Sequence, residues 1–175
     1  MTTEYILAGF GGQGMLFAGK FLACMGMIED KKVSWMPSYG PEMRGGTANC
    51  SVIISNELIG SPIVTTPDVL VAMNLPSLDK FEKMAKKGGT IFVDSTLVSR
   101  KVERTDVTVV YVPATRLASD NEMPDLANII MMGKVLSAVD AGLIKSALEQ
   151  SVSSSRHDMI EANLKAFAIG KNQKD

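Results

Sequence analysis

A glycine-rich turn near the N-terminus is the first candidate site. It follows a short apolar segment, fits the pattern G-x-G-x-x-G and reads Gly9-Phe10-Gly11-Gly12-Gln13-Gly14. Glycines in such a turn let backbone N–H groups approach an anion at the start of the next helix. The same residues could instead serve only to pack that helix closely onto the preceding strand. The residues leave both interpretations open.

A dinucleotide site would need one further residue. Binding of the ribose hydroxyls requires an acidic side chain at the end of the second strand, about 20 residues beyond the glycines. Glu29 and Asp30 come before that strand, whose end reads Met36-Pro37-Ser38. This placement disfavours an NAD site.

A second loop, from Ser38 to Thr47, combines glycines, a proline and an oppositely charged pair. Arg44 could bind a carboxylate or phosphate through two parallel hydrogen bonds, and Glu42 could hold its guanidinium in place. In an open α/β sheet, ligands bind where loops leave the carboxyl ends of the strands. On the residues alone, a surface turn with an incidental ion pair is the slightly favoured interpretation.

The cysteines and the histidine argue against a metal or redox centre on this chain. Cys24 and Cys50 are too few for the four thiolates of an iron–sulfur cluster, and His157 is the single histidine available to a zinc site. Both cysteines are expected in the core. If the protein takes part in redox chemistry, the redox centres lie on partner chains.

The elements that position the two loops alternate between strand and helix, as is typical of a layered α/β fold with a largely parallel sheet. The predicted strands are Tyr5 to Gly9, Val33 to Met36, Thr47 to Ser55, Val69 to Met73, Ile91 to Val93 and Val107 to Val112. The predicted helices are Gly14 to Ile28, Leu78 to Lys87, Asp125 to Ala141, Ile144 to Val152 and Asp158 to Ala168. We expect one domain over residues 1–175.

One pair of strands departs from a pure Rossmann pattern. Thr47 to Ser55 and Leu58-Ile59 are joined by the turn residues Asn56-Glu57, which predicts an antiparallel hairpin. The predicted fold class is therefore α/β, with a Rossmann-like, mainly parallel sheet, an inserted β-hairpin and C-terminal helices.

Charge and hydropathy exclude several classes of protein. The formal net charge is −1, so no basic field would draw the chain to nucleic acid or to an anionic membrane. No apolar stretch is long enough to span a bilayer without a glycine, proline or charge, and Met1 to Glu4 lacks the basic region of a signal peptide. The expected location is the cytoplasm.

The glycine turn and the second loop together resemble motifs of a known family. The second motif reads Tyr39-Gly40-Pro41-Glu42-Met43-Arg44-Gly45-Gly46-Thr47. The pair resembles the gamma subunit of 2-oxoacid:ferredoxin (acceptor) oxidoreductases, and the likeness covers nearly the whole chain. The form of the second motif is most similar to the 2-oxoglutarate and branched-chain 2-oxoacid enzymes.

The resemblance implies a subunit that works only inside a larger enzyme. That enzyme would convert a 2-oxoacid, with 2-oxoglutarate the leading substrate, to CO2 and an acyl-CoA such as succinyl-CoA, and would reduce ferredoxin. Thiamine diphosphate, Mg and iron–sulfur clusters would be held by alpha, beta and delta subunits, with no cofactor bound by the gamma chain alone and no catalytic residue on it. Whether two gamma chains contact each other in a homodimer is left open.

The resemblance also implies that both loops face coenzyme A (CoA) or the alpha-subunit side of the active site. The residues assigned to that face are Gly11, Gly12, Gln13, Gly14, Tyr39, Gly40, Pro41, Glu42, Arg44, Gly45 and Gly46. Two other functions remain open: a gamma subunit of a branched-chain or indolepyruvate 2-oxoacid enzyme, and a free-standing nucleotide- or CoA-binding regulatory module. A stand-alone NAD-dependent dehydrogenase is disfavoured, because no convincing proton-transfer histidine is present.

Overall fold

The computed structural model describes residues 1–39, 47–153 and 156–174. Within these residues the chain forms a six-stranded sheet with the order β2-β3-β1-β4-β5-β6. The strands are β1 (Thr2–Phe10), β2 (Lys32–Tyr39), β3 (Thr47–Ser55), β4 (Val69–Ala72), β5 (Thr90–Asp94) and β6 (Thr108–Val112). Short apolar segments rich in Val and Ile supply these strands, as expected of a sheet covered on both faces.

The sheet is mainly parallel. β1, β4, β5 and β6 run in one direction, whereas β3 runs antiparallel to both of its neighbours, β1 and β2. The carboxyl ends of β1, β2, β4, β5 and β6 therefore share one edge of the sheet, which also holds the start of β3. The predicted Rossmann-like fold class is confirmed.

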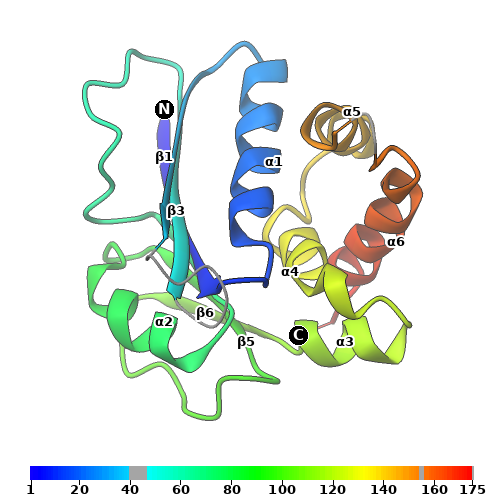
Figure 1. The fold of residues 1–175 in the computed structure, drawn as a ribbon. Helices are drawn as coiled ribbons and strands as arrows, with labels where there is room; N and C mark the ends of the chain where they lie inside the picture. Colours follow the sequence, from blue (N-terminus) through cyan, green and yellow to red (C-terminus); the bar gives the residue numbers. More distant parts are fainter. Residues whose placement is uncertain (40–46, 154–155, 175) are drawn as a thin grey trace.

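One face of the sheet is covered by most of the helices (Figure 1). They are α1 (Met15–Ile28), α3 (Ala114–Asp120), η2 (Pro124–Leu126), α4 (Ala127–Val135), α5 (Ala141–Ser151) and α6 (Met159–Lys171). Figure 1 shows α1 lying between the sheet and α5, and α1 contacts both. This position explains why α1 has so little polar face: Phe21 and Leu22 are fully buried, and the Phe21 ring meets the Phe167 ring edge-on at 6.3 Å.

The opposite face carries a smaller cover. It consists of α2 (Leu75–Phe81), η1 (Glu82–Met84) and irregular segments, and its core includes Leu70, Leu78 and Ile91. Side chains along β1 alternate between the two cores, so that Ile6 packs towards α2 and Leu7 packs towards α1. The central strands are thus buried on both sides.

Two predictions about the strands were wrong. The second strand does not stop at Pro37, which pairs with Cys50 inside β2. Proline is tolerated there because β2 is an edge strand and needs hydrogen bonds on one side only. The predicted hairpin with Leu58-Ile59 is absent, since residues 56–68 form no strand and Leu58 is exposed. The antiparallel partners of β3 are β1 and β2 instead.

Two predictions about the helices also need correction. The helix expected over Asp125 to Ala141 is broken into η2 and α4, and α5 begins at Ala141 with Asp140 as its N-cap. The helix expected over Leu78 to Lys87 begins earlier, after the N-cap Asn74, and ends in η1. The seven-residue helix α3 was not predicted.

The described residues contain neither a membrane-spanning helix nor a cluster of metal ligands. In the ranges 1–39, 47–153 and 156–174, no helix has the length and hydropathy needed to cross a bilayer. Over the same part of the chain, no three His, Cys, Asp or Glu side chains cluster as metal ligands would.

Candidate functional site

The glycine turn and the second loop leave the same edge of the sheet. The turn follows β1, whose last residue Phe10 pairs with Thr47, the first residue of β3. Tyr39, the last residue of β2, pairs with Ala48, which in turn pairs with Gly9. The described residues that flank the second loop therefore lie beside the start of the glycine turn. This is the carboxyl edge, where open α/β sheets bind ligands.

The glycine turn has the backbone geometry of a tight turn that leads into a helix. Gly12 and Gly14 have φ values of +98° and +72°, which side chains with a Cβ rarely adopt. Gly14 is the N-cap of α1 and provides no side-chain cap, and the first turn of α1 contains no acidic residue. The first backbone N–H groups of α1 therefore have no partner within the helix, at the positive end of its dipole.

The side chain of Gln13 stabilises this turn through hydrogen bonds. Its Oε1 accepts hydrogen bonds from the Phe10 backbone N–H at 2.6 Å and from Asn74 Nδ2 at 3.2 Å. Its Nε2 donates to the Met73 carbonyl oxygen at 3.4 Å. Because Asn74 also caps α2 by accepting from the Ser77 N–H, the side chain of Gln13 ties the turn to the end of β4 and the start of α2.

Asn128 holds the other end of the turn and was not predicted from the sequence. Its Nδ2 donates to the Gly14 carbonyl oxygen at 3.0 Å, and the side chain occupies the space that a Cβ on Gly14 would need. Asn128 is 4% exposed and comes from α4, 114 residues further along the chain. The signal in the sequence was a single polar residue within an apolar run, which by itself does not name a partner.

The second loop can be located only by its ends. Gly40, Pro41, Glu42, Arg44, Gly45 and Gly46 lie outside the described residues, and of Tyr39 only the backbone is described. The predicted pairing of Glu42 with Arg44, and their contact with a ligand, therefore stay predictions.

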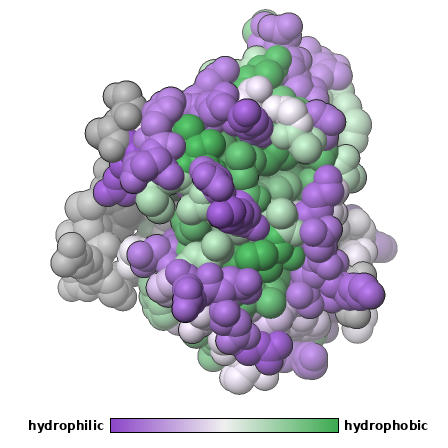
Figure 2. All heavy atoms as spheres, turned by 90° about the vertical axis from the view of Figure 1, so that its right-hand side faces the viewer, coloured by the Kyte–Doolittle hydropathy of each residue, from purple (hydrophilic) through white to green (hydrophobic). Residues whose placement is uncertain are grey.

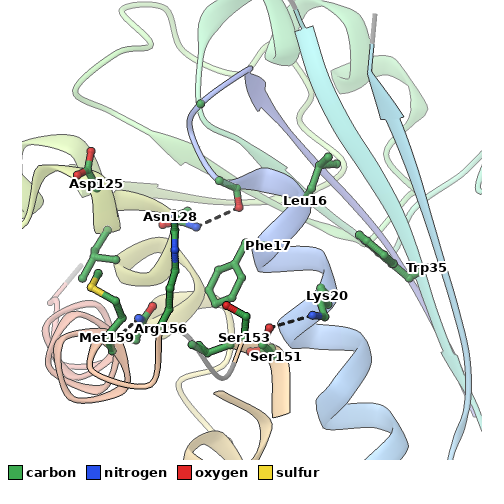
Figure 3. Close-up of a pocket in the computed structure, with 15 residues that line it drawn as sticks. Leu16, Phe17, Lys20, Trp35, Asp125, Asn128, Ser151, Ser153, Arg156 and Met159 are labelled. Atoms are coloured by element: carbon green, nitrogen blue, oxygen red, sulfur yellow. Dashed lines mark hydrogen bonds between the residues drawn. The ribbon is translucent and has the colours of Figure 1, made fainter. Parts of the chain in front are cut away.

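A cavity of about 650 Å³ opens next to the glycine turn, between α1, β2 and the C-terminal helices (Figure 3). Its lining combines apolar side chains with two cations and one acid: Gly12, Gly14, Leu16, Phe17, Lys20, Trp35, Asp125, Leu126, Asn128, Ser151, Val152, Ser153, Arg156, Met159 and Asn163. Lys20 Nζ donates to the Ser151 carbonyl oxygen at 3.0 Å. Figure 2 shows the same helix-covered side of the molecule, with apolar surface at its centre and hydrophilic side chains around it.

Two buried amide oxygens in the cavity wall have no hydrogen-bond partner among the described residues. They are Oδ1 of Asn128 and Oδ1 of Asn163, whose side chains each donate through Nδ2 to a backbone carbonyl oxygen. The two residues differ in what they hold. Asn128 reaches across to Gly14 in the glycine turn, whereas Asn163 donates at 2.6 Å to Met159, one turn earlier in its own helix.

Other polar candidates have structural roles. Cys50 and Cys24 are buried as predicted, and burial raises the pKa of the Cys50 thiol to about 12. Asp94, at the end of β5, is fully buried and accepts hydrogen bonds from the backbone N–H groups of Thr96 and Thr115. Asp94 therefore closes a turn.

The fold defines a Rossmann-like α/β domain with a glycine turn between β1 and α1. Residues 4–173 match the family model described as pyruvate ferredoxin/flavodoxin oxidoreductase. The chain belongs to this family.

Three similar proteins show how this domain is used. The chain is 40% identical over 167 residues to ketoisovalerate oxidoreductase subunit VorA of Methanothermobacter thermautotrophicus, covering 94% of this chain and 35% of VorA. It is 38% identical over 174 residues to 2-oxoglutarate synthase subunit KorC of Methanocaldococcus jannaschii, covering 97% of this chain and 92% of KorC. The gamma subunit of a keto/oxoacid ferredoxin oxidoreductase from Geobacter sulfurreducens superposes with a TM-score of 0.78 at 30% identity, covering 97% and 96% of the two chains.

The relatives differ in length. The chain spans about a third of VorA but nearly all of KorC and of the Geobacter gamma subunit. The domain thus occurs both as part of a longer chain and as a separate subunit.

Proposed function

We propose that this chain is the gamma subunit of a multi-subunit 2-oxoacid:ferredoxin oxidoreductase that oxidises 2-oxoglutarate. The match over nearly the full length of a 2-oxoglutarate synthase subunit carries this proposal. The enzyme joins the acyl group of 2-oxoglutarate to CoA, releases CO2, and passes the electrons to ferredoxin. The chain works in the cytoplasm with alpha, beta and delta subunits and is inactive alone.

The chemistry is divided among the subunits. Alpha and beta hold thiamine diphosphate and Mg²⁺, which supply the chemistry that removes CO2, and beta and delta hold the iron–sulfur clusters. The two cysteines of this chain cannot provide the four thiolates that a cluster needs. The gamma chain binds and orients CoA.

The glycine turn supplies one part of the CoA site. CoA carries several phosphate groups, and backbone N–H groups at a helix start attract such anions. The uncapped start of α1 supports this assignment, as does Gly12, where no atom of the described residues lies within 4 Å of the position of a Cβ. Arg44, held by Glu42, adds a guanidinium from the second loop, which leaves the same edge of the sheet. Gly11, Tyr39, Gly40, Pro41, Gly45 and Gly46 belong to the same proposed CoA-facing surface, where residues without a side chain would let the backbone approach the ligand.

Two substitutions test the CoA site in the purified complex. Gly12→Ala places a Cβ on a backbone with φ of +98° but meets no atom of the described residues within 4 Å, so we expect its effect to be confined to the turn. We expect both Gly12→Ala and Arg44→Ala to raise the KM for CoA about tenfold and to leave the KM for the 2-oxoacid unchanged.

Gly88→Ala is the matched control for the strained glycine. Gly88 has φ of +78°, also meets no atom within 4 Å, and lies before β5 at the opposite edge of the sheet. The KM for CoA should not change in this variant. Unchanged CoA kinetics in both Gly12→Ala and Arg44→Ala would refute the CoA site.

A branched-chain 2-oxoacid enzyme is the second candidate, favoured by the 40% identity with the ketoisovalerate oxidoreductase subunit. The two candidates share the CoA site and differ in the acid that is oxidised. Steady-state kinetics of the complex with 2-oxoglutarate, ketoisovalerate, indolepyruvate and pyruvate separates them. We expect the highest kcat/KM with 2-oxoglutarate, and a higher value with ketoisovalerate would establish the alternative.

A further inference from the structure

We propose that Asn128 is a positioning residue for CoA, which acts by fixing the carbonyl group of Gly14 and with it the first turn of α1. The inference rests on the proposed CoA site at the glycine turn. It assigns a role in that site to Asn128, although Asn128 lies on a helix far away in the sequence and is not itself placed against CoA.

The contact is directed at the point where the turn becomes the helix. Asn128 Nδ2 donates to the Gly14 carbonyl oxygen, which also accepts the N–H of Ala18, the first backbone bond of α1. Gly14 has φ of +72° and provides no side-chain cap of its own. Asn128 therefore fixes the peptide that precedes the free N–H groups of α1.

The glycine turn is held from two layers of the fold. Gln13 attaches the turn to Asn74 and the start of α2 on one side of the sheet, and Asn128 attaches it to α4 on the other (Figure 3). With both ends fixed, the N–H groups that approach an anion are already oriented before CoA arrives. Such preorganisation strengthens binding because the ligand need not order the turn.

Stability alone does not account for the asparagine. Its Oδ1 is buried with no hydrogen-bond partner in the part of the chain that the structure describes, and such an atom lowers the stability of a fold relative to an apolar group of the same shape. Leucine has the same number and branching of side-chain heavy atoms as asparagine, although its methyl groups are larger, and it would leave no polar atom unpaired. Asn128→Leu should therefore keep the fold stable and lose only the hold on Gly14.

Asn163 provides a matched control. It is 3% exposed where Asn128 is 4%, lies in the same cavity wall, and also has an unpaired Oδ1. Its Nδ2 donates to the Met159 carbonyl oxygen within α6, and among the described residues it forms no hydrogen bond with the glycine turn. Asn163→Leu thus removes the same chemical groups from the same environment without touching Gly14.

The experiment compares steady-state kinetics and thermal unfolding of the assembled enzyme with Asn128→Leu or Asn163→Leu. For Asn128→Leu we expect a five- to tenfold rise in the KM for CoA, which corresponds to the loss of about one hydrogen bond. The kcat should stay within about twofold of the parent value, and the Tm should be unchanged or higher. For Asn163→Leu we expect the KM for CoA to stay as in the parent enzyme. An equal KM in both variants would overturn the role of Asn128.

Two further variants distinguish a failure of the positioning role of Asn128 from a failure of the CoA site itself. Asn128→Ala is used if the leucine variant does not assemble, since alanine also lacks the donor and needs less space. Gly12→Ala reports on the CoA site itself. If Gly12→Ala raises the KM for CoA while both Asn128 variants leave it unchanged, the site stands and the positioning role is refuted. If none of these variants changes the KM, the CoA site at the turn is wrong.

Discussion

The Cys50 thiol lies under the first turn of α1, where its Sγ donates a hydrogen bond to the Met15 carbonyl oxygen at 3.3 Å. Burial raises its pKa from 9.0 to about 12, although hydrogen bonds involving Trp35 and Gly19 act in the opposite direction. In the unfolded chain the thiol would ionise from about pH 9, whereas in the folded protein it keeps its proton to about pH 12. The stability that this difference contributes is complete below pH 9 and is lost as the pH rises towards 12.

This behaviour can be measured with Cys50→Ala. On moving from about pH 8 to about pH 10, the free energy of unfolding of the parent protein should fall by about 1.4 kcal/mol more than that of the variant. Urea unfolding at the two pH values gives both numbers. Equal losses in the two proteins would mean that the thiol is not protonated at pH 10 in the fold.

For individual residues, the sequence predicted the glycines of the turn but not the side-chain hydrogen bonds that fix it. Gly12 and Gly14 belong to a local motif, so a tight turn at these residues can be inferred from spacing alone. Asn128 contacts Gly14 from 114 residues away, and no local pattern indicates such a partner. Gln13 was expected to face a ligand, yet its side chain forms hydrogen bonds inside the turn. Whether it also contacts a ligand stays a prediction.

Among the elements, α4 and α6 pack unusually closely. A Cβ on Gly170 would clash with the backbone carbonyl of Ile130, and a Cβ on Gly133 would clash with that of Phe167. These contacts involve backbone atoms, which cannot move aside as a flexible side chain can. The two glycines therefore set the distance between the helices that carry Asn128 and Asn163.

Gly170→Ala should force the two helices apart. We expect a loss of about 2–4 kcal/mol in the free energy of unfolding, as for other overpacked core positions, measured by urea denaturation. Gly60→Ala is the control, because Gly60 has no atom within 4 Å of the position of a Cβ and lies in the irregular segment before β4. A loss for Gly170→Ala no larger than that for Gly60→Ala would contradict the close packing.

The strength of the local signal decided which elements could be predicted. The strand Thr47–Ser55 was predicted with its observed bounds, and α1 differs by one residue, because long apolar or β-branched runs are distinctive. The seven residues of α3 are too few for a periodic pattern, and packing stabilises the helix. The break before α5 depends on the cap at Asp140, whose Oδ1 accepts from the N–H groups of Gly142 and Leu143.

For the whole molecule, the order of the strands could not be deduced from the sequence. The hairpin prediction correctly anticipated antiparallel pairing by β3 but gave it the wrong partner, because pairing depends on which strand edge is free in three dimensions. The observed order brings the flanks of the second loop next to the glycine turn. This adjacency supports a shared role for the two loops in binding CoA.

The surface that can contact other chains is also a property of the whole molecule. Trp35 on the edge strand β2 is 38% exposed and lines the cavity together with residues from α1 and α6. In the family, a domain of this kind occurs both inside longer chains and as a separate subunit.

The most direct test of the account is an anaerobic affinity purification from native cells through a tag on this chain. The co-purifying chains are identified by mass spectrometry, and the eluate is assayed for CoA-dependent reduction of ferredoxin by 2-oxoglutarate. The account predicts larger chains that carry thiamine diphosphate and iron–sulfur clusters, together with this activity. Recovery of this chain alone, without the activity and with tight binding of CoA or a nucleotide, would contradict the account and establish a free-standing binding module.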